Sequence, residues 1–343
     1  MSEEPAPVRA AIVGAGAIAR QHLACVAGLP GATMVAVCDL SPATAEAAAE
    51  RFGVPAVFTD HEELLERSRP TVVHVTTPPA AHFRVAADAL AAGATAIVEK
   101  PLAASPEEAA ELIDAARSAA GLLVEDYNYL FNAEVRDLLA RRDRGELGEV
   151  RHVEVDIGLD VGVDGHGRAG LPTAGLGPHE RDFLPHLASL AHAFVGPHRD
   201  VTAVAREHEV VALIDAASGT ATLRFSAHSR PDSFSLRVHG SRMRAEAALF
   251  EPRLTLERLR SGPRPLNPLL NQLAGSRGAA RAAVAGLVRK VGGGPGAYEG
   301  LWELLRRTYR ALAEGTEPPV SLDQVEEVNR LVTAVAAAAD RGA

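Results

Sequence analysis

The residues of this chain best suited to chemistry are those of the tripeptide Glu99-Lys100-Pro101, which closes an apolar stretch. A lysine ammonium group can polarise a hydroxyl or carbonyl group while a hydride leaves or joins its carbon atom. Two earlier signals indicate where this lysine lies: a glycine turn at Gly14 and an acidic strand end at Asp39. Together they predict a dinucleotide-binding sheet with Lys100 at its carboxyl edge, next to the nicotinamide.

The glycine turn has the sequence GAGAIA at 14–19, between an apolar run and a helical pattern. Gly14 permits a tight turn, and Gly16 lets the backbone approach a pyrophosphate group. The phosphates then meet the free N–H groups at the start of the helix. The residues predicted to bind the cofactor here are Gly14, Gly16, Ala17 and Ile18.

Asp39 ends the second apolar run, twenty residues after Ala19. A carboxylate in this place accepts hydrogen bonds from the ribose hydroxyls and repels a 2′-phosphate, so NAD is favoured over NADP. The alternative is that Asp39 only caps the helix that begins near Pro42, although Ser41 is the better-placed cap.

A third strand end carries Thr76, Thr77 and Pro78, followed by His82 in the next helix. The cofactor is expected to pass this edge of the sheet, so these four residues are predicted to bind it, together with Glu99 and Lys100. The sequence leaves open whether His82 contacts the cofactor or is a buried histidine that starts a helix.

Composition limits the class of protein. The chain has 343 residues, which predicts two domains, and a net charge of −9, which argues against general binding of nucleic acid. The two cysteines, Cys25 and Cys38, lie in helical and apolar-strand patterns, so a reducing compartment and a cytoplasmic protein are expected. The N-terminus lacks the pattern of a secretory signal, no apolar run is long enough to span a membrane, and no metal site is predicted.

The first half alternates apolar runs with amphipathic stretches, which predicts an α/β domain with a doubly wound parallel sheet, a Rossmann fold, over 1–126. The expected strands are 8–14, 33–39, 72–77, 95–99 and 122–126. The expected helices are 17–28, 42–52, 80–92 and 106–119.

The second half, 127–343, predicts an α+β domain with a large open antiparallel sheet, because strand patterns follow one another with short turns. The expected strands are 149–161, 201–206, 210–216, 220–226, 233–239 and 244–249, and the expected helices are 132–144, 298–314 and 322–340. The sequence leaves open whether helix 322–340 packs back on the first domain.

The segments 76–82 and 99–101 resemble the glucose–fructose oxidoreductase/inositol dehydrogenase family (Gfo/Idh/MocA). The resemblance continues in GELGEV at 145–150 and EPPVS at 317–321. It implies the two domains described above and hydride transfer to or from a sugar, nucleotide-sugar or cyclitol carbon. It also implies homodimers or homotetramers formed largely through the second sheet.

The family's second motif is Asp-x-x-x-His, which Asp182 and His186 match. Residues four apart share a helical face, so His186 is expected to take the hydroxyl proton while Asp182 binds a hydroxyl or orients the imidazole. Leu184 and Ser189 differ from the residues that are usual in the family at these positions. If the motif is aligned further upstream, His179 is the alternative catalytic residue. The predicted catalytic residues are Lys100, Asp182 and His186.

Other hypotheses stay open. In family members a polar residue often lies near the nicotinamide just after the first domain, and Asn128 is predicted to do so here. The enzyme could retain NAD and use transient oxidation for a net non-redox step, or the protein could bind ligand without catalysis. The segment 258–298 has seven basic and no acidic residues, with a short amphipathic helix expected over 277–291. It is interpreted as a mobile excursion or subunit contact, with a phosphate-bearing substrate or an anionic membrane surface as alternatives.

Overall fold

A computed structural model of the chain describes residues 7–160, 176, 178–206, 208–258, 264–273, 275–276 and 296–341. Contacts group the chain into two compact units. The first is Met1–Asn128 with Leu301–Asn329, and the second is Tyr129–Gly300 with Arg330–Ala343. The domain boundaries expected from the sequence, 1–126 and 127–343, remain a prediction.

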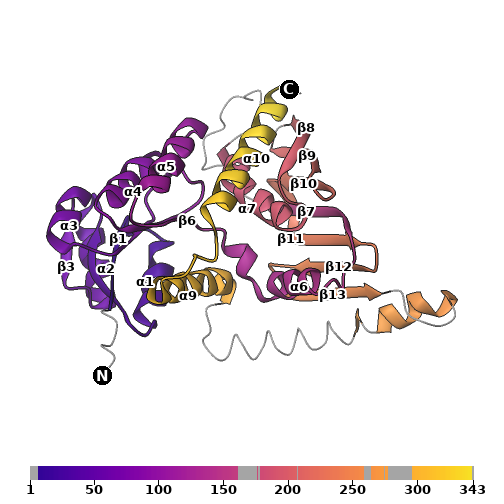
Figure 1. Ribbon diagram of the computed structural model, residues 1–343, viewed down its shortest axis with the longest axis horizontal. Coiled ribbons are helices and arrows are strands. Elements are labelled where there is room, and N and C mark those ends of the chain that lie inside the picture. Colours follow the sequence, from indigo (N-terminus) through magenta and orange to yellow (C-terminus); the bar gives the residue numbers. More distant parts are fainter. Residues whose placement is uncertain are drawn as a thin grey trace. The chain divides into compact units, whose positions relative to one another are not determined.

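The first unit contains a six-stranded parallel sheet of order β3-β2-β1-β4-β5-β6 (Figure 1). The strands are β1 (Val8–Val13), β2 (Ala32–Cys38), β3 (Ala56–Phe58), β4 (Val72–Val75), β5 (Thr95–Val98) and β6 (Leu123–Glu125). The helices are α1 (Ala19–Ala27), α2 (Pro42–Phe52), α3 (His61–Ser68), η1 (Pro79–Ala81), α4 (His82–Ala91), α5 (Pro106–Ser118) and most of α9 (Glu299–Glu314). Helix α10 (Leu322–Arg341) begins in this unit.

Helix α1 contacts α2, while α4 contacts both α3 and α5, so helices cover the two faces of this sheet in separate layers. The strands are therefore buried on both sides, as their nearly continuous apolar sequences predict: Ala10, Ala11 and Ile12 of β1 have no exposed surface. The predicted doubly wound Rossmann fold is confirmed.

Local signals explain where the helices begin. The Ser41 hydroxyl accepts a hydrogen bond from the Thr44 N–H at the start of α2, and Ser105 does the same for Glu108 at the start of α5. A proline follows each serine, with its fixed φ suited to the first helical position.

The sequence reasoning missed β3 and α3. Strand β3 has only three residues, too few to show a period. Helix α3 is mostly polar, and its clearest signal is Asp60, whose carboxylate accepts the N–H groups of Glu62 and Glu63.

The second unit contains a seven-stranded sheet of order β13-β12-β11-β7-β10-β9-β8 (Figure 1). The strands are β7 (Val150–Asp160), β8 (His198–Arg206), β9 (Glu209–Ala216), β10 (Thr220–Ser226), β11 (His228–Gly240), β12 (Met243–Ala248) and β13 (Arg253–Arg258). The other elements are η2 (Asn128–Phe131), α6 (Ala133–Asp143), α7 (Pro178–Val195), η3 (Arg264–Leu266) and η4 (Gly296–Tyr298).

This sheet differs from a fully antiparallel one in a single pair, because β10 runs parallel to β7. The chain leaves β7 through α7 and returns from the sheet edge by β8 and β9, so β10 reaches β7 in the same direction. Strand β13 was also not predicted.

Helix α7 packs on β7, β9 and β10 and covers one face of the sheet. The predicted alternation along β7 places Val153, Val155 and Ile157 in the core, each at most 1% exposed. The expected helix 277–291 lies outside the described residues. None of the helices in the ranges given above is long and apolar enough to cross a bilayer.

We expect Gly14→Ala to destabilise the first unit. Gly14 has φ +90°, and an added Cβ would lie 2.7 Å from the backbone of Thr76 and Thr77. Backbone strain together with this clash should cost about 2 kcal/mol or more of unfolding free energy. Gly16→Ala is the matched control, since its Cβ would meet no atom within 4 Å. Urea unfolding of both variants tests this, and equal stabilities would contradict it.

Candidate active site

The turn after β1 is held by hydrogen bonds to the ends of both neighbouring strands. The Gly14 N–H donates to the Cys38 carbonyl oxygen of β2 (2.8 Å), and the Thr76 hydroxyl after β4 donates to the Gly14 carbonyl oxygen (2.6 Å). Ile18 is the N-cap of α1 and provides no side-chain hydrogen bond. The N–H groups at this helix start therefore have no side-chain cap, which suits an anionic ligand.

Beside this turn lies a cavity of about 750 Å³. Its wall is formed by Val13, Gly14, Gly16, Cys38, Asp39, Leu40, Thr59, Asp60, His61, Thr76, Thr77, Pro78, Ala80, Ala81, Arg84 and Val85. Six residues predicted from the sequence lie in this wall: Gly14, Gly16, Asp39, Thr76, Thr77 and Pro78. The other predicted cofactor residues, Ala17, Ile18, His82, Glu99, Lys100 and Asn128, do not line it.

Two observations match this cavity to a dinucleotide. The space next to Gly16 is open, so a pyrophosphate can approach its backbone. The Thr77 hydroxyl oxygen is buried without a hydrogen-bond partner among the described residues, which leaves it for a ligand.

Asp39 joins the glycine turn to the start of α2. One carboxylate oxygen accepts the Ala15 N–H (2.8 Å), and the other accepts the Ser41 N–H (2.9 Å). Ser41 is the N-cap of α2, so the helix does not depend on Asp39 for that role. Each Asp39 oxygen retains a lone pair that can accept from a ribose hydroxyl.

The sequence reasoning missed Leu40 and Arg84 in the cavity wall. Leu40 is 92% exposed, a large apolar surface for a planar ring to cover. The Arg84 guanidinium forms ion pairs with Glu62 and Asp88. An apolar residue directly after Asp39 was the sequence signal for Leu40. Arg84 had no such signal, because only the fold places α4 beside this cavity.

His82 is buried and bridges two loops at the sheet edge. Its Nδ1 lies 2.7 Å from the Pro101 carbonyl oxygen, and its Nε2 lies 2.8 Å from the Thr77 carbonyl oxygen. Of the two interpretations left open, this geometry matches the buried histidine, because both ring nitrogens face backbone oxygens.

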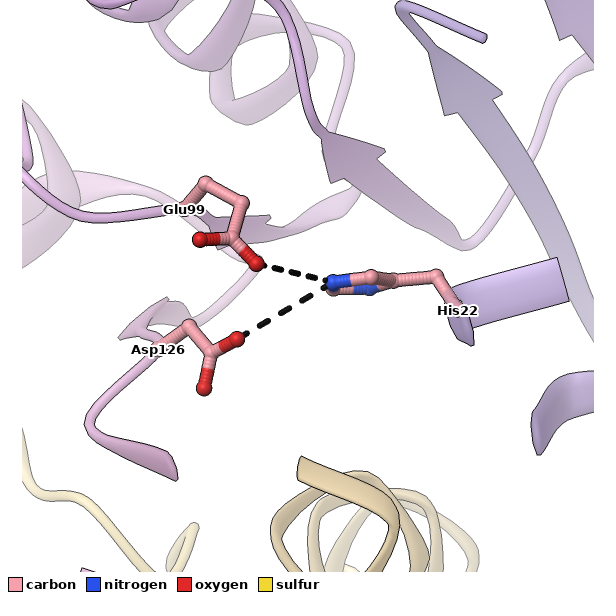
Figure 2. Close-up of side chains that lie close together, drawn as sticks. All are labelled: His22, Glu99 and Asp126. Atoms are coloured by element: carbon pink, nitrogen blue, oxygen red, sulfur yellow. Dashed lines mark hydrogen bonds and ion pairs between the residues drawn. The ribbon is translucent and has the colours of Figure 1, made fainter. Parts of the chain in front are cut away.

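Lys100 follows β5 at the carboxyl edge, as predicted, and the Glu99 N–H donates to the Val75 carbonyl oxygen at 3.0 Å. The Glu99 side chain meets a buried histidine, with its Oε1 3.1 Å from Nε2 of His22 (Figure 2). Asp126 follows β6 on the other side of β5 and also approaches this imidazole. His22 and Asp126 were not singled out from the sequence.

A second buried group, Glu125, is the last residue of β6. The Glu125 carboxylate accepts hydrogen bonds from the Tyr127 hydroxyl (2.6 Å) and the Asn329 amide (2.7 Å). Burial raises the pKa of Glu125 to about 7 despite these hydrogen bonds. The predicted residue Asn128 comes next, and its amide oxygen is buried without a partner among the described residues.

In the second unit, Asp182 and His186 lie on α7, one helical turn apart. His186 is 4% exposed, and its ring makes an edge contact with Tyr129 at 4.7 Å between centroids. The backbone of His179 belongs to the same helix, and its side chain lies outside the described residues.

The comparisons with known proteins agree with this fold. Residues 8–127 match the family model GFO_IDH_MocA, described as an oxidoreductase family with an NAD-binding Rossmann fold. The D-glucoside 3-dehydrogenase of Escherichia coli (strain K12) is 33% identical over 51% of this chain and 52% of its own length. The dTDP-3,4-didehydro-2,6-dideoxy-alpha-D-glucose 3-reductase of Saccharopolyspora spinosa is 35% identical over 45% of this chain and 46% of its own.

The chain thus spans about half the length of these curated relatives. A solved structure of levoglucosan dehydrogenase with NADH and levoglucosan covers 98% of both chains with a TM-score of 0.79, at 18% identity. That likeness extends the shared fold to both units. Residues 8–127, which contain the glycine turn and all the residues that line the cavity, thus match a family of oxidoreductases with an NAD-binding Rossmann fold.

Proposed function

We propose that this protein is an NAD-dependent oxidoreductase that moves a hydride between nicotinamide and a secondary alcohol or ketone. The substrate class is a sugar, a nucleotide-sugar or a cyclitol. The observation that carries the proposal is Lys100 at the carboxyl end of β5, in the same parallel sheet as the glycine turn and its cavity. The matched relatives, which act on a glucoside and on a dTDP-sugar, support the substrate class.

The residues that would hold NAD are those of the cavity. The backbone at Gly14 and Gly16 would receive the pyrophosphate, and Asp39 the adenosine ribose hydroxyls. Leu40 would cover the adenine ring. When bound, NAD supplies the site that accepts or gives the hydride.

The chain's own residues would then handle charge and protons. Lys100 stabilises the negative charge that develops on the reacting oxygen. His186 takes the hydroxyl proton during oxidation and returns it during reduction, and Asp182 binds a neighbouring hydroxyl or orients the imidazole. The Asp-x-x-x-His spacing and the burial of the His186 side chain support this assignment.

The protein is further proposed to form homodimers or homotetramers through the seven-stranded sheet. One sheet face is covered by α7, whereas the other carries half-exposed charged side chains such as Glu154 and Arg237. Light scattering of the purified protein measures the oligomeric state.

We expect Lys100→Ala to abolish hydride transfer and to leave NAD affinity within about threefold. The lysine follows β5 and does not line the cavity that would hold the adenosine half of the cofactor. Reduction of NAD with a panel of polyols and glycosides gives turnover, and fluorescence titration gives affinity. Lys290→Ala serves as the control for a lysine elsewhere in the chain. Wild-type turnover in Lys100→Ala would remove this residue from the mechanism.

His186→Ala is expected to reduce turnover more than His179→Ala does, by about a hundredfold against less than tenfold. The reason is the placement of His186 one turn after Asp182 on the helix face that packs against the sheet. Steady-state rates of the two variants decide between the registers. If His179→Ala lowers turnover more than His186→Ala does, the catalytic histidine is His179, at the start of the helix.

The wild-type enzyme should prefer NAD(H) to NADP(H) by roughly thirty- to a hundredfold, which is ~2–3 kcal/mol of repulsion and lost hydrogen bonds with the 2′-phosphate. In Asp39→Ala the binding of NADP should improve modestly and that of NAD should weaken. Asp39→Asn removes the charge and keeps an acceptor for only one of the Ala15 and Ser41 N–H groups, so it should fall between wild type and Asp39→Ala. Titration of both cofactors tests this, and equal wild-type affinities would show that Asp39 does not reach the ribose.

A further inference from the structure

A buried polar chain runs through the first unit beneath the Glu99-Lys100-Pro101 turn. It begins at Tyr309 of α9, passes through His74 of β4 and His22 of α1, and ends at Glu99 and Asp126 (Figure 2 shows the last three). His22 and His74 have no exposed surface, and Asp126 is 1% exposed. Buried polar groups of this kind are costly unless each is hydrogen-bonded, so their protons are constrained.

Hydrogen bonds through the two imidazole rings connect Tyr309 to Glu99. Burial, followed by the neighbouring His22, lowers the pKa of His74 well below its usual value, so its ring carries a single proton. His74 Nε2 lies 2.7 Å from the Tyr309 hydroxyl oxygen, and His74 Nδ1 lies 2.8 Å from His22 Nδ1, so one of the two Nδ1 atoms donates to the other. His22 Nε2 donates to Glu99 Oε1 (3.1 Å), because a carboxylate oxygen can only accept.

Asp126 lies beside the same imidazole as Glu99, with its Oδ2 3.9 Å from His22 Nε2. Both Asp126 oxygens are buried, and neither has a hydrogen-bond partner among the described residues. An ionised carboxylate in this place would be an uncompensated buried charge next to Glu99, so Asp126 is more stable with a proton.

The directions of the two pKa shifts agree with a proton on Asp126. Burial and then the charge of Glu99 raise the pKa of Asp126 well above its usual value. Burial would also raise the pKa of Glu99, but the hydrogen bond and charge of His22 lower it to about 2. Like charges at short distance separate two carboxyl groups in this way.

Lys100 interacts electrostatically with three carboxyl groups, those of Glu99, Glu125 and Asp126. If all three were ionised, three carboxylates would surround one ammonium group and one imidazole. With Asp126 protonated and Glu125 near its pKa of about 7, the negative charge beside the lysine falls toward that of Glu99 alone. A neutral arrangement avoids most of the cost of burying unbalanced charge.

We propose that His22, Glu99 and Asp126 form a positioning cluster for Lys100, in which Asp126 holds a proton, Glu99 holds the single negative charge, and His22 fixes Glu99. This inference rests on the proposed role of Lys100 in hydride transfer. The cluster sets the charge beside the lysine and fixes the end of β5, while none of its three members touches the substrate.

The decisive comparison is between two amide variants. Asp126→Asn replaces a neutral acid by a neutral amide and should keep turnover within about threefold of wild type. Glu99→Gln removes the one negative charge and should lower kcat at least tenfold, with KM and NADH affinity within about threefold. Asp114→Asn and Glu107→Gln, both exposed on α5, are the matched controls and should behave as wild type. If Asp126→Asn lowers kcat as much as Glu99→Gln does, the proposal is overturned.

The pH dependence of stability gives a second readout that needs no activity. An acid whose pKa is raised on folding stabilises the protein below its unfolded pKa and loses that contribution as the pH rises toward the folded pKa. Wild type should therefore lose melting temperature as the pH rises above the ordinary pKa range of a carboxyl group, because the pKa values of Asp126 and Glu125 are both raised, whereas Asp126→Asn should lose less. Identical pH profiles would show that Asp126 is already ionised and would overturn the assignment.

Infrared difference spectra test the proton itself, since the carbonyl band of a protonated carboxyl group should weaken in Asp126→Asn and persist in Asp114→Asn. His22→Gln, which retains a donor at the Nε2 position, should lower kcat less than His22→Leu does.

A metal measurement is a further test. The atoms of His22, Glu99 and Asp126 that could bind a metal ion lie within 4.8 Å of one another, so the metal content of the holoenzyme is also measured. A stoichiometric divalent cation would overturn the proposal. Should Lys100→Ala prove fully active, the infrared and melting data still test the cluster separately from the function.

Discussion

All the strands of a parallel sheet present their carboxyl ends at one edge, and the site in the first unit depends on this constraint. The turn after β1 fits there only because Gly14 lies against the backbone after β4 and donates to the end of β2. The same edge collects Asp39, Thr76 and Lys100 from segments that are far apart in the chain. Cofactor binding and the lysine are thus consequences of one topology, and a side chain at Gly14 disturbs them together.

The second constraint is the cost of burying charge, and it applies to the carboxyl groups beneath the carboxyl edge of the first sheet. The carboxyl groups of Glu125 and Asp126 lie beneath this edge with at most 1% of their surface exposed, and the Glu99 side chain beside them is 12% exposed. Such groups remain only when protons or hydrogen bonds balance them. The Glu99-Lys100-Pro101 turn therefore has two faces, with a lysine assigned to chemistry and a glutamate held by His22. This explains physically why the glutamate and the lysine occur together.

Patterns with a repeating local cause were predictable. The apolar runs of β1, β2 and β4, the serine caps of α2 and α5, and the alternation of β7 each depend on neighbours within a few residues. The elements that were missed lack such causes, because β3 is too short for a period and α3 has little apolar face. The parallel pairing of β7 with β10 depends on where α7 and two later strands place the chain, which no local pattern encodes.

The sequence by itself determined the glycine turn and the carboxylate after β2, because a dinucleotide-binding turn needs glycine where the backbone approaches the phosphates and an acid suits the ribose hydroxyls. It also determined the place of the lysine, because the apolar run before Lys100 marks the end of β5. Only the tertiary structure decided what the side chains around them contact. The Glu99 side chain contacts His22, seventy-seven residues earlier, and His82 bridges two backbone carbonyl groups. The physical reason is that a hydrogen-bond partner is chosen by distance in space, and distances between segments so far apart are fixed only when the sheet and its helices pack.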